Sequence, residues 1–345
     1  MRKLFILALL FILVFTTFGY GELKIGVIYL GTTNDAGWNY AHKRGFLSLK
    51  KQYGNKINIT EIEDVGGNAA DIYTALDNLI GLGNKLIFAT AWDFMNPTIE
   101  TAKKHPDIVF EHCSGYKRAD NVGTYFVRMY NMDYLAGIVA GLKTTNNKIG
   151  MVLPHAIPEV VRQANAFALG VFRVNPNAKV KILWTNSWYD PAKESEYARA
   201  LIEWGATVLA HGCDSPSVVA TAEKLGVWVI GYGNDQSKYA PTKWLTAPVW
   251  NWQVVYKSIV EDVLNNNWKS KAIWDKYGAV LSPVRIKSSI LVSAMKEIFE
   301  HDYNIFTGEL IDNKGRVIAK QGESLSDNDI WNMYWLNHNI IGTLP

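Results

Sequence analysis

The sequence has few of the residues on which several classes of protein depend. It contains only two cysteines among 345 residues, and charged residues make up 19% of the chain. Basic and acidic side chains nearly balance, at 35 against 32, and no stretch gathers lysine and arginine into the stripe that a polyanion binder needs. We therefore expect no nucleic-acid partner. The hydrophobic content of 48% suits a soluble globular chain long enough for two domains.

The two cysteines do not indicate a metal or redox site. Cys113 and Cys213 each follow a different expected strand in different halves of the chain. This placement favours two separate thiols, although their pairing is left open. His112 and His211 lie beside them, but the spacing of these residues matches no zinc motif. We expect no metal and no cofactor.

Motifs of nucleotide binding and hydrolysis are also missing. The run from Gly137 through Gly141 to Lys143 resembles a phosphate loop, but its glycine spacing is wrong and Lys does not follow the second glycine. We expect instead a small-residue helix face packed on a sheet. Gly231 and Gly233 lack the third glycine of a dinucleotide fingerprint. No Gly-x-Ser-x-Gly or His-Glu-x-x-His occurs, although catalytic acid–base pairs have no regular spacing and an enzyme is not excluded.

The first 21 residues have the pattern of a secretory signal. Arg2 and Lys3 precede an apolar run over residues 4–15, and small residues follow up to Gly19 or Gly21. The run is shorter than the roughly 20 apolar residues of a membrane-spanning helix, so cleavage is favoured over anchoring. No cysteine follows the run to carry a lipid. We expect a periplasmic or extracellular protein, exported without a lipid anchor.

Expected strands and helices alternate along the rest of the chain, and the pattern occurs twice. The strands are expected at residues 24–30, 57–65, 86–89 and 108–110, and again at 148–153, 180–184, 207–210 and 227–230. A repeat of about 120 residues is too long for a solenoid unit. Strict alternation predicts parallel sheets with right-handed crossovers. We therefore expect two similar α/β lobes.

The segments after the second copy are shared between the lobes. We expect a short strand at residues 245–247, a helix at 252–265 on the first lobe, a crossing near Pro283, and a terminal hairpin that turns at residues 312–315. The predicted N-terminal lobe comprises residues 22–125 plus 250–283. The predicted C-terminal lobe comprises residues 126–249 plus 284–345.

Tryptophans follow strands in both halves of the chain. Ligands of open α/β sheets bind beyond the carboxyl ends of the strands. One Trp among 13 is as readily a surface or core residue, but three in equivalent places predict a site. Aromatic faces bury a planar ligand, while Asp and Asn form hydrogen bonds to the edge of a heterocycle. The residues concerned are Trp38, Trp92 and Trp188, with Asn39, Asp93 and Asp190 beside them.

Five stretches in order are similar to motifs of one known family, the basic membrane protein (BMP) family of substrate-binding proteins for ABC transporters. Its better-known members bind purine nucleosides. Asp-Ala-Gly-Trp-Asn at residues 35–39 resembles the family's Asp-x-Ser-Phe-Asn loop. Tyr-Leu-Ala-Gly at 134–137, Ser-Trp-Tyr-Asp-Pro at 187–191 and Gly-Tyr-Gly-Asn-Asp-Gln at 231–236 also have family counterparts, as does the tail from residue 306 to 325. The resemblance covers nearly all of the mature chain.

The resemblance implies a type I periplasmic binding protein. Such a protein has two Rossmann-like lobes joined by a three-segment hinge, and it closes on its ligand in the interlobe cleft. It implies a receptor without catalysis that delivers a purine to an ABC permease in the membrane, and we expect a monomer. Trp38 and Trp188 fall where the family's Phe pair clamps the purine, and Asn39 and Asp93 fall near the groups that read its polar edge. Trp92 and Asn234 are further candidate ligand contacts.

Two positions depart from the family's nucleoside-binding pattern. Where the family holds the ribose with an Asp and a Lys, this sequence has Gly233 and Trp250. Buried hydroxyl groups without partners cost about 1 to 3 kcal/mol each. We therefore expect a free nucleobase such as adenine, with Trp250 in the ribose space. One alternative is a sugar receptor of the same fold, which would need several Asp, Asn and Arg at strand ends, where few Arg occur. Another is a nucleoside-cleaving enzyme, which would need a poised carboxylate or nucleophile against the sugar.

Overall fold

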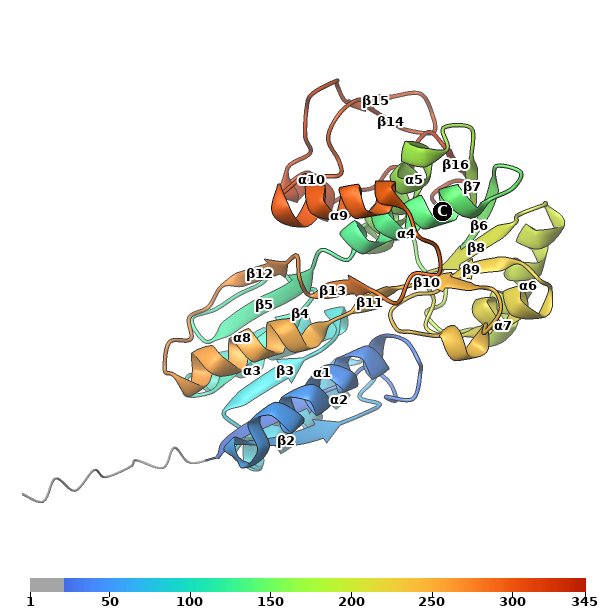
Figure 1. Ribbon diagram of the computed structural model, residues 1–345. Helices are drawn as coiled ribbons and strands as arrows, with labels where there is room; N and C mark the ends of the chain where they lie inside the picture. Colours follow the sequence, from blue (N-terminus) through green and yellow to red (C-terminus); the bar gives the residue numbers. More distant parts are fainter. Residues whose placement is uncertain (1–21) are drawn as a thin grey trace, which may run out of the picture.

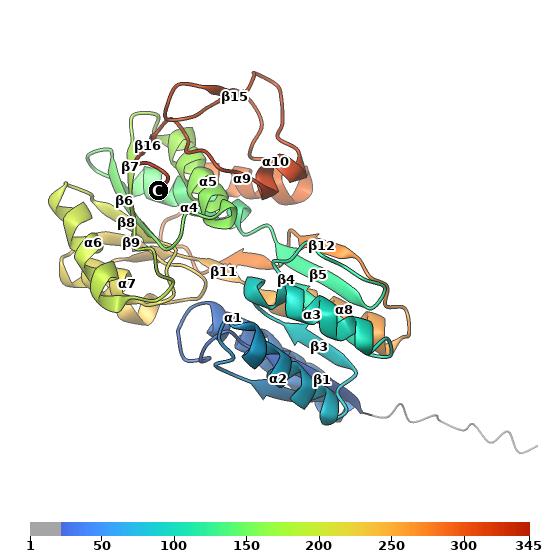
Figure 2. The same ribbon diagram turned by 180° about the vertical axis from the view of Figure 1, so that it is seen from behind.

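The computed structural model describes residues 22–345, and the predicted signal segment, residues 1–21, lies outside them. The chain forms two α/β lobes connected by a narrow central region (Figures 1 and 2). Each lobe contains one six-stranded sheet of parallel strands. Among the described residues, no helix combines the length and apolar composition needed to cross a membrane. The predicted pair of α/β lobes is confirmed.

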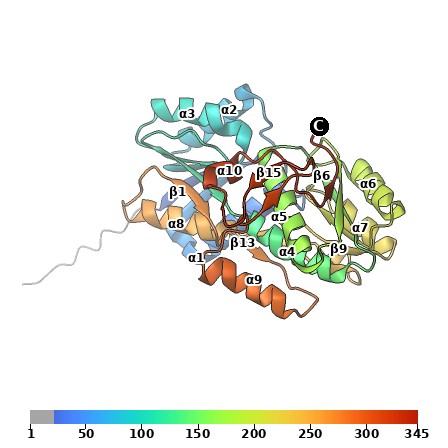
Figure 3. The same ribbon diagram turned by 90° about the horizontal axis from the view of Figure 1, so that it is seen from above.

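The first lobe has the strand order β12-β5-β4-β3-β1-β2. Alternate residues of its strands face opposite sides: Ile25 and Val27 belong to one core and Ile28 to the other. Both faces are therefore covered, as expected of a parallel sheet. Helices α1 (Trp38–Tyr53) and α8 (Trp252–Leu264) lie on one face, and α2 (Ala69–Gly81) and α3 (Met95–Lys104) on the other (Figure 3). The strands are β1 (Leu23–Ile28), β2 (Ile57–Ile62), β3 (Leu86–Ala89), β4 (Val109–Cys113), β5 (Val122–Val127) and β12 (Ala272–Asp275).

The second lobe has the strand order β10-β9-β8-β6-β7-β16. One face packs on α4 (Tyr130–Lys143) and α5 (Pro158–Val174), and the other on α6 (Pro191–Glu203) and α7 (Ser217–Lys224). A tail adds α9 (Ser289–Glu300), the hairpin of β14 (Leu310–Ile311) and β15 (Val317–Ala319), and α10 (Asp327–Trp331). The strands are β6 (Lys148–Leu153), β7 (Lys179–Trp184), β8 (Val208–His211), β9 (Trp228–Ile230), β10 (Trp244–Thr246) and β16 (Ile340–Ile341).

Three segments connect the lobes: the step from β5 to α4, the step from β10 to α8, and the return from β12 to α9. The second and third segments pair as a short antiparallel sheet of β11 (Pro248–Trp250) and β13 (Ala279–Leu281). Strand β12 therefore joins the first lobe although it follows β10 of the second lobe in sequence (Figure 1). This pairing gives the hinge regular structure.

The small-residue face of α4 packs on a helix and not on a sheet, so this expectation was wrong. A Cβ at Gly137 would lie 2.1 Å from the carbonyl oxygen of Phe167 in α5, and one at Gly141 would lie 2.9 Å from that of Val171. Glycine lets the two helix backbones approach this closely. The two cysteines are both free and buried, Cys113 at the end of β4 and Cys213 just after β8.

Candidate functional site

Loops at the carboxyl ends of strands in both lobes face one another across a cleft. Its deeper part, here called the inner chamber, has a volume of about 110 Å³. The first lobe contributes Leu30, Trp38, Asn39, Ala91, Trp92, Asp93 and Ser114, and the second contributes Ile157, Glu159, Trp188, Asp214 and Tyr232. A wider part of about 400 Å³, the outer chamber, shares six of these residues and extends past Arg162 and Trp331. The cleft lies where this fold class binds ligands.

The indole of Trp38 is held in place by the first lobe and the hinge. Trp38 is the first residue of α1, and its indole Nε1 donates a hydrogen bond to the carbonyl of Thr90 at 2.9 Å. Trp250 and Trp252 make edge contacts with the ring, at centroid distances of 5.3 and 5.6 Å. The ring of Trp38 therefore forms a fixed wall of the inner chamber.

Asn39 is positioned by Asp35 in the loop before α1. The Asp35 carboxylate accepts hydrogen bonds from the backbone amides of Gly37, Asn39 and Tyr40 at 2.9 to 3.0 Å. It also accepts one from Nδ2 of Asn39 at 2.8 Å, which fixes the direction of that side chain. A carboxylate at a helix N-terminus is favoured by the helix dipole. Asn39 thus lines the chamber as an oriented amide.

The opposite wall comes from the second lobe. Trp188 is half-buried, and its one aromatic neighbour among the described residues is His155, at a centroid distance of 5.4 Å. Trp92 remains 50% exposed beside Tyr116, and the neighbouring Asp93 is also exposed. Trp38 and Trp188 therefore line the same cavity from opposite lobes, while Trp92 and Asp93 stand at its rim.

Gly233, Asn234 and Trp250 lie behind the inner chamber and do not line it. The indole of Trp250 is 1% exposed and stacks on Trp252 at a centroid distance of 5.0 Å. Gly233 has a φ of +73°, and a Cβ there would lie 3.4 Å from the Trp250 indole. The two departures from the family pattern are therefore in contact, and the backbone amide of Trp250 also donates a hydrogen bond to the carbonyl of Gly233 at 3.1 Å.

Hydrogen bonds join the lobes at the floor of the cleft. The backbone amide of Trp38 donates to Oδ1 of Asp214 at 2.9 Å. Nδ2 of Asn234, which is 2% exposed, donates to the carbonyls of Ala36 and Gly37 at 3.0 and 2.7 Å. The loop before α1 is therefore hydrogen-bonded to the loops after β8 and β9, and these bonds hold the two lobes in a closed arrangement.

The inner chamber is acidic. Its lining includes the carboxylates of Asp93, Glu159 and Asp214 but no lysine or arginine among the described residues. Burial, together with repulsion from Asp35, raises the pKa of Asp214 well above its usual range. Burial also raises the pKa of Glu159, and attraction to Arg162 opposes this shift. An ionised carboxylate only accepts hydrogen bonds, whereas a carboxyl group kept protonated by burial also donates one, and in either form its oxygens offer acceptors to ligand N–H or O–H groups.

Sequence reasoning singled out Trp38, Asn39, Trp92, Asp93 and Trp188, and the structure places all of these at the cleft. It missed Glu159 and Tyr232, and it did not select Asp214 although that residue occupies the place of Asp93 in the second half. Each of these three follows the carboxyl end of a strand: β6, β9 and β8 respectively. Asp214 and Tyr232 come within three residues of their strands, where the strand-end rule applies, whereas Glu159 lies in the first turn of α5.

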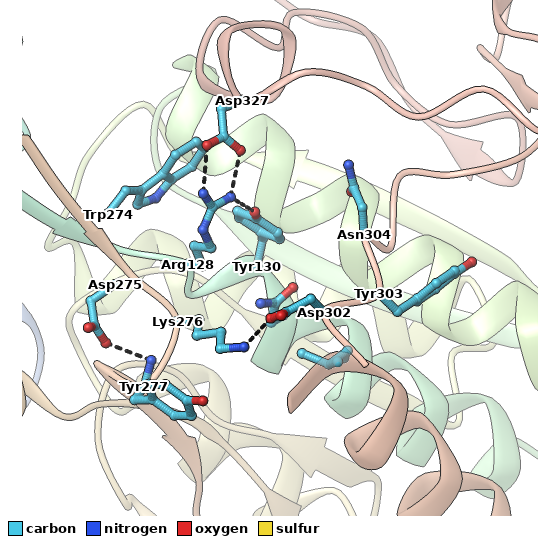
Figure 4. Close-up of a pocket in the computed structure, with 12 residues that line it drawn as sticks. Arg128, Tyr130, Trp274, Asp275, Lys276, Tyr277, Asp302, Tyr303, Asn304 and Asp327 are labelled. Atoms are coloured by element: carbon cyan, nitrogen blue, oxygen red, sulfur yellow. Dashed lines mark hydrogen bonds and ion pairs between the residues drawn. The ribbon is translucent and has the colours of Figure 1, made fainter. Parts of the chain in front are cut away.

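A second cavity of about 440 Å³ lies on the hinge side of the molecule (Figure 4). Four of the five charged side chains that line it form two ion pairs within the protein. Arg128 donates to both carboxylate oxygens of Asp327, at 2.7 and 2.8 Å, and lies 4.3 Å from the Trp274 ring centroid. Lys276 forms an ion pair with Asp302. Because these pairs link the two lobes, this region acts as structural support behind the cleft.

Comparisons with known proteins agree with this geometry. The family model of PnrA-like ABC transporter substrate-binding proteins matches residues 22–309. A purine-binding protein of Brucella abortus is 35% identical over 331 residues, which cover 94% of each chain. A putative ABC transporter glucose-binding protein of Haloferax volcanii is 36% identical over 247 residues, covering 72% of this chain and 62% of that protein. A solute-binding protein structure from Conexibacter woesei matches with a TM-score of 0.70 at 22% identity, over 81% of this chain and 97% of that one.

Two α/β lobes with a cavity between them give the chain the periplasmic binding protein fold. The chain belongs to the PnrA-like family of ABC transporter substrate-binding proteins, which includes proteins named basic membrane proteins. The resemblance found in the sequence is thereby confirmed.

Proposed function

We propose that this protein captures a purine outside the cytoplasm and delivers it to an ABC permease, and that the ligand is a free nucleobase such as adenine. The observation that carries the proposal is the pair of indoles, Trp38 and Trp188, which line one chamber from opposite lobes. A flat ring between them buries both of its faces, and it contacts both lobes only when the cleft is closed. The 35% identity to a purine-binding protein supports the ligand class.

The space behind Trp38 supports a base over a nucleoside. In the family pattern an Asp and a Lys hold the ribose, and Gly233 and the buried Trp250 at the corresponding positions offer neither a carboxylate nor an amine. Trp250 makes an edge contact with Trp38 at 5.3 Å, so the indole cluster is continuous from the chamber to the hinge. A ribose in this region would lose its hydrogen-bond partners at about 1 to 3 kcal/mol for each hydroxyl.

We further propose that the protein performs no chemistry on its ligand and works as a monomer. The carboxylates of the inner chamber then serve as hydrogen-bond acceptors. Incubating the protein with adenosine and measuring released base tests this directly. Intact adenosine is the expected result, and steady release of adenine would assign a glycosidase instead.

Calorimetric titration with adenine and adenosine tests the ligand assignment. We expect adenine to bind at least tenfold more tightly, because adenosine loses about 1 kcal/mol or more at each unpaired hydroxyl. Clearly tighter binding of adenosine would overturn the choice of a free base. Glucose serves as a third titrant because one relative is a putative glucose-binding protein. Binding of glucose without binding of either purine would assign a sugar receptor.

A further inference from the structure

The carboxylate of Glu159 stands where the inner and outer chambers meet, and the protein makes no use of it. Glu159 is in the first turn of α5 and lines both chambers. Within residues 22–345, its carboxylate has no hydrogen-bond partner, and Arg162 acts on it only through its charge. The side chain of Glu159 is half-buried, so a ligand that displaces the remaining water must supply a hydrogen-bond donor to compensate for the lost hydration. A ligand in the inner chamber is placed to supply that donor.

The other two carboxylates of the inner chamber differ from Glu159 in their hydrogen bonds and their exposure. Asp214 accepts the backbone N–H of Trp38 through Oδ1 and is part of the contact between lobes. Asp93 is on the first lobe and exposed at the rim. Glu159 is on the second lobe, at the other side of the cleft. Asp93 and Glu159 are therefore available as hydrogen-bond acceptors, one on each lobe.

We propose that Glu159 accepts a hydrogen bond from the imidazole-ring N–H of a free purine, while Asp93 accepts one from its exocyclic amine. The inference rests on the proposed function and adds a reason for its selectivity. A free aminopurine carries N–H donors on both of its rings, and these donors point to different edges. In a nucleoside the sugar replaces the imidazole N–H, so the carboxylate of Glu159 would lose this donor.

The carboxyl groups of the inner chamber also bear on which other purines it can bind. Three carboxylates and no lysine or arginine line the inner chamber as the structure describes it. An anionic purine such as urate brings oxygen acceptors to carboxyl groups that are themselves acceptors, so it gains few hydrogen bonds from them. A neutral aminopurine offers N–H groups to these acceptors, and the hydroxyl groups of Ser114 and Tyr232 line the same chamber. The site is therefore selective for neutral bases that are rich in donors.

The test uses adenine and 9-methyladenine, which lacks the imidazole N–H but carries no sugar. Affinities of both are measured by calorimetry for the unmodified protein, Glu159→Leu and Glu159→Gln, with Glu196→Leu on the exposed side of α6 as the matched control. In the unmodified protein we expect adenine to bind at least tenfold more tightly than 9-methyladenine. In Glu159→Leu this ratio should fall to about twofold or less, because only adenine loses a partner. Glu159→Gln keeps a neutral acceptor and should give an intermediate ratio.

The outcomes separate this inference from the proposed function. If the unmodified protein binds adenine and the ratio to 9-methyladenine is unchanged in Glu159→Leu, the assignment of Glu159 is wrong while the purine receptor stands. If the unmodified protein binds neither compound, the proposed function itself fails. A general disturbance of the fold would weaken both ligands alike, and the ratio would then stay at its original value. If Glu159→Leu does not fold, an unchanged ratio in Glu159→Gln overturns the assignment.

Discussion

The backbone amide of Trp38 and the carboxylate of Asp214 form a 2.9 Å hydrogen bond across the cleft, from one lobe to the other. Trp38 also supplies a wall of the inner chamber. Lobe closure and ligand contact therefore involve the same residue. A ligand that binds only the closed arrangement shifts the population toward it.

Gly37, the residue before Trp38, has no side chain, and this allows the two lobes to approach closely. A Cβ there would lie 2.2 Å from Oδ1 of Asp214 and 2.6 Å from its Cα. We predict that Gly37→Ala holds the lobes apart and weakens adenine binding at least tenfold. Gly81→Ala is the matched control, because nothing lies within 4 Å of that position. Calorimetry measures affinity, and small-angle X-ray scattering with and without adenine measures closure. Full closure in Gly37→Ala would contradict this account.

Asn234 provides two further contacts between the lobes. Its side-chain N–H groups donate to the carbonyls of Ala36 and Gly37. Each hydrogen bond contributes about 0.5 to 1.5 kcal/mol, so Asn234→Ala should weaken adenine binding roughly tenfold. The change should appear mainly as faster ligand release in stopped-flow measurements, since an open cleft frees the ligand. Asn78→Ala, at an exposed position of α2, should leave both rates unchanged.

Trp188 offers the cleaner test of stacking. Trp38 supports the hinge cluster, whereas Trp188 is half-buried and contacts His155 as its aromatic neighbour. Stacking of a base on an aromatic ring contributes about 1 to 3 kcal/mol. We predict that Trp188→Leu weakens adenine binding at least tenfold at unchanged thermal stability. Trp204→Leu, where the indole faces Lys148 and Lys181, is the control. Equal affinities in the two variants would remove Trp188 from the site.

Glu111 predicts a pH dependence of stability that is separate from binding. Its side chain is 1% exposed, and Oε1 accepts a hydrogen bond from Nε1 of Trp268 at 2.7 Å. Burial raises the pKa of Glu111 from 4.5 to about 8. Between these values the unfolded chain has released a proton that the folded protein retains, so stability falls as pH rises from 4.5 to about 8.

Glu111→Gln removes this titration while keeping an acceptor for Trp268. Urea unfolding from pH 5 to pH 9 should show that the variant gains stability relative to the unmodified protein as pH rises. The gain is about 1.4 kcal/mol for each pH unit within the window. The difference should become constant above about pH 8. Parallel curves for the two proteins would mean that Glu111 is ionised throughout.

The regular part of the fold could be predicted because each buried parallel strand is a short apolar run. Strands β3 and β6 match their expected bounds. Strand β5 was missed although all six of its residues are buried, because no helix separates it from β4 and a glycine interrupts its apolar run. Strand β16 has only two residues and becomes a strand by pairing with β7. Such elements depend on tertiary contacts and leave little local pattern.

The candidate site divides in the same way. The tryptophans at strand ends could be found because position after a strand is visible in sequence. Glu159 could not be distinguished from an ordinary acidic residue in a first helical turn, which the helix dipole favours in any protein. The contact between Gly233 and Trp250 joins residues 17 positions apart and depends on the positive φ of the glycine. The sequence alone therefore does not show that these two residues are in contact.

A crystal structure of the protein with adenine tests the central claim most directly. The account predicts a closed cleft with the purine ring lying between the indoles of Trp38 and Trp188 and with its N–H groups directed at the carboxylates of Asp93 and Glu159. Adenine bound elsewhere, or in the cleft without contact to either indole, would contradict it.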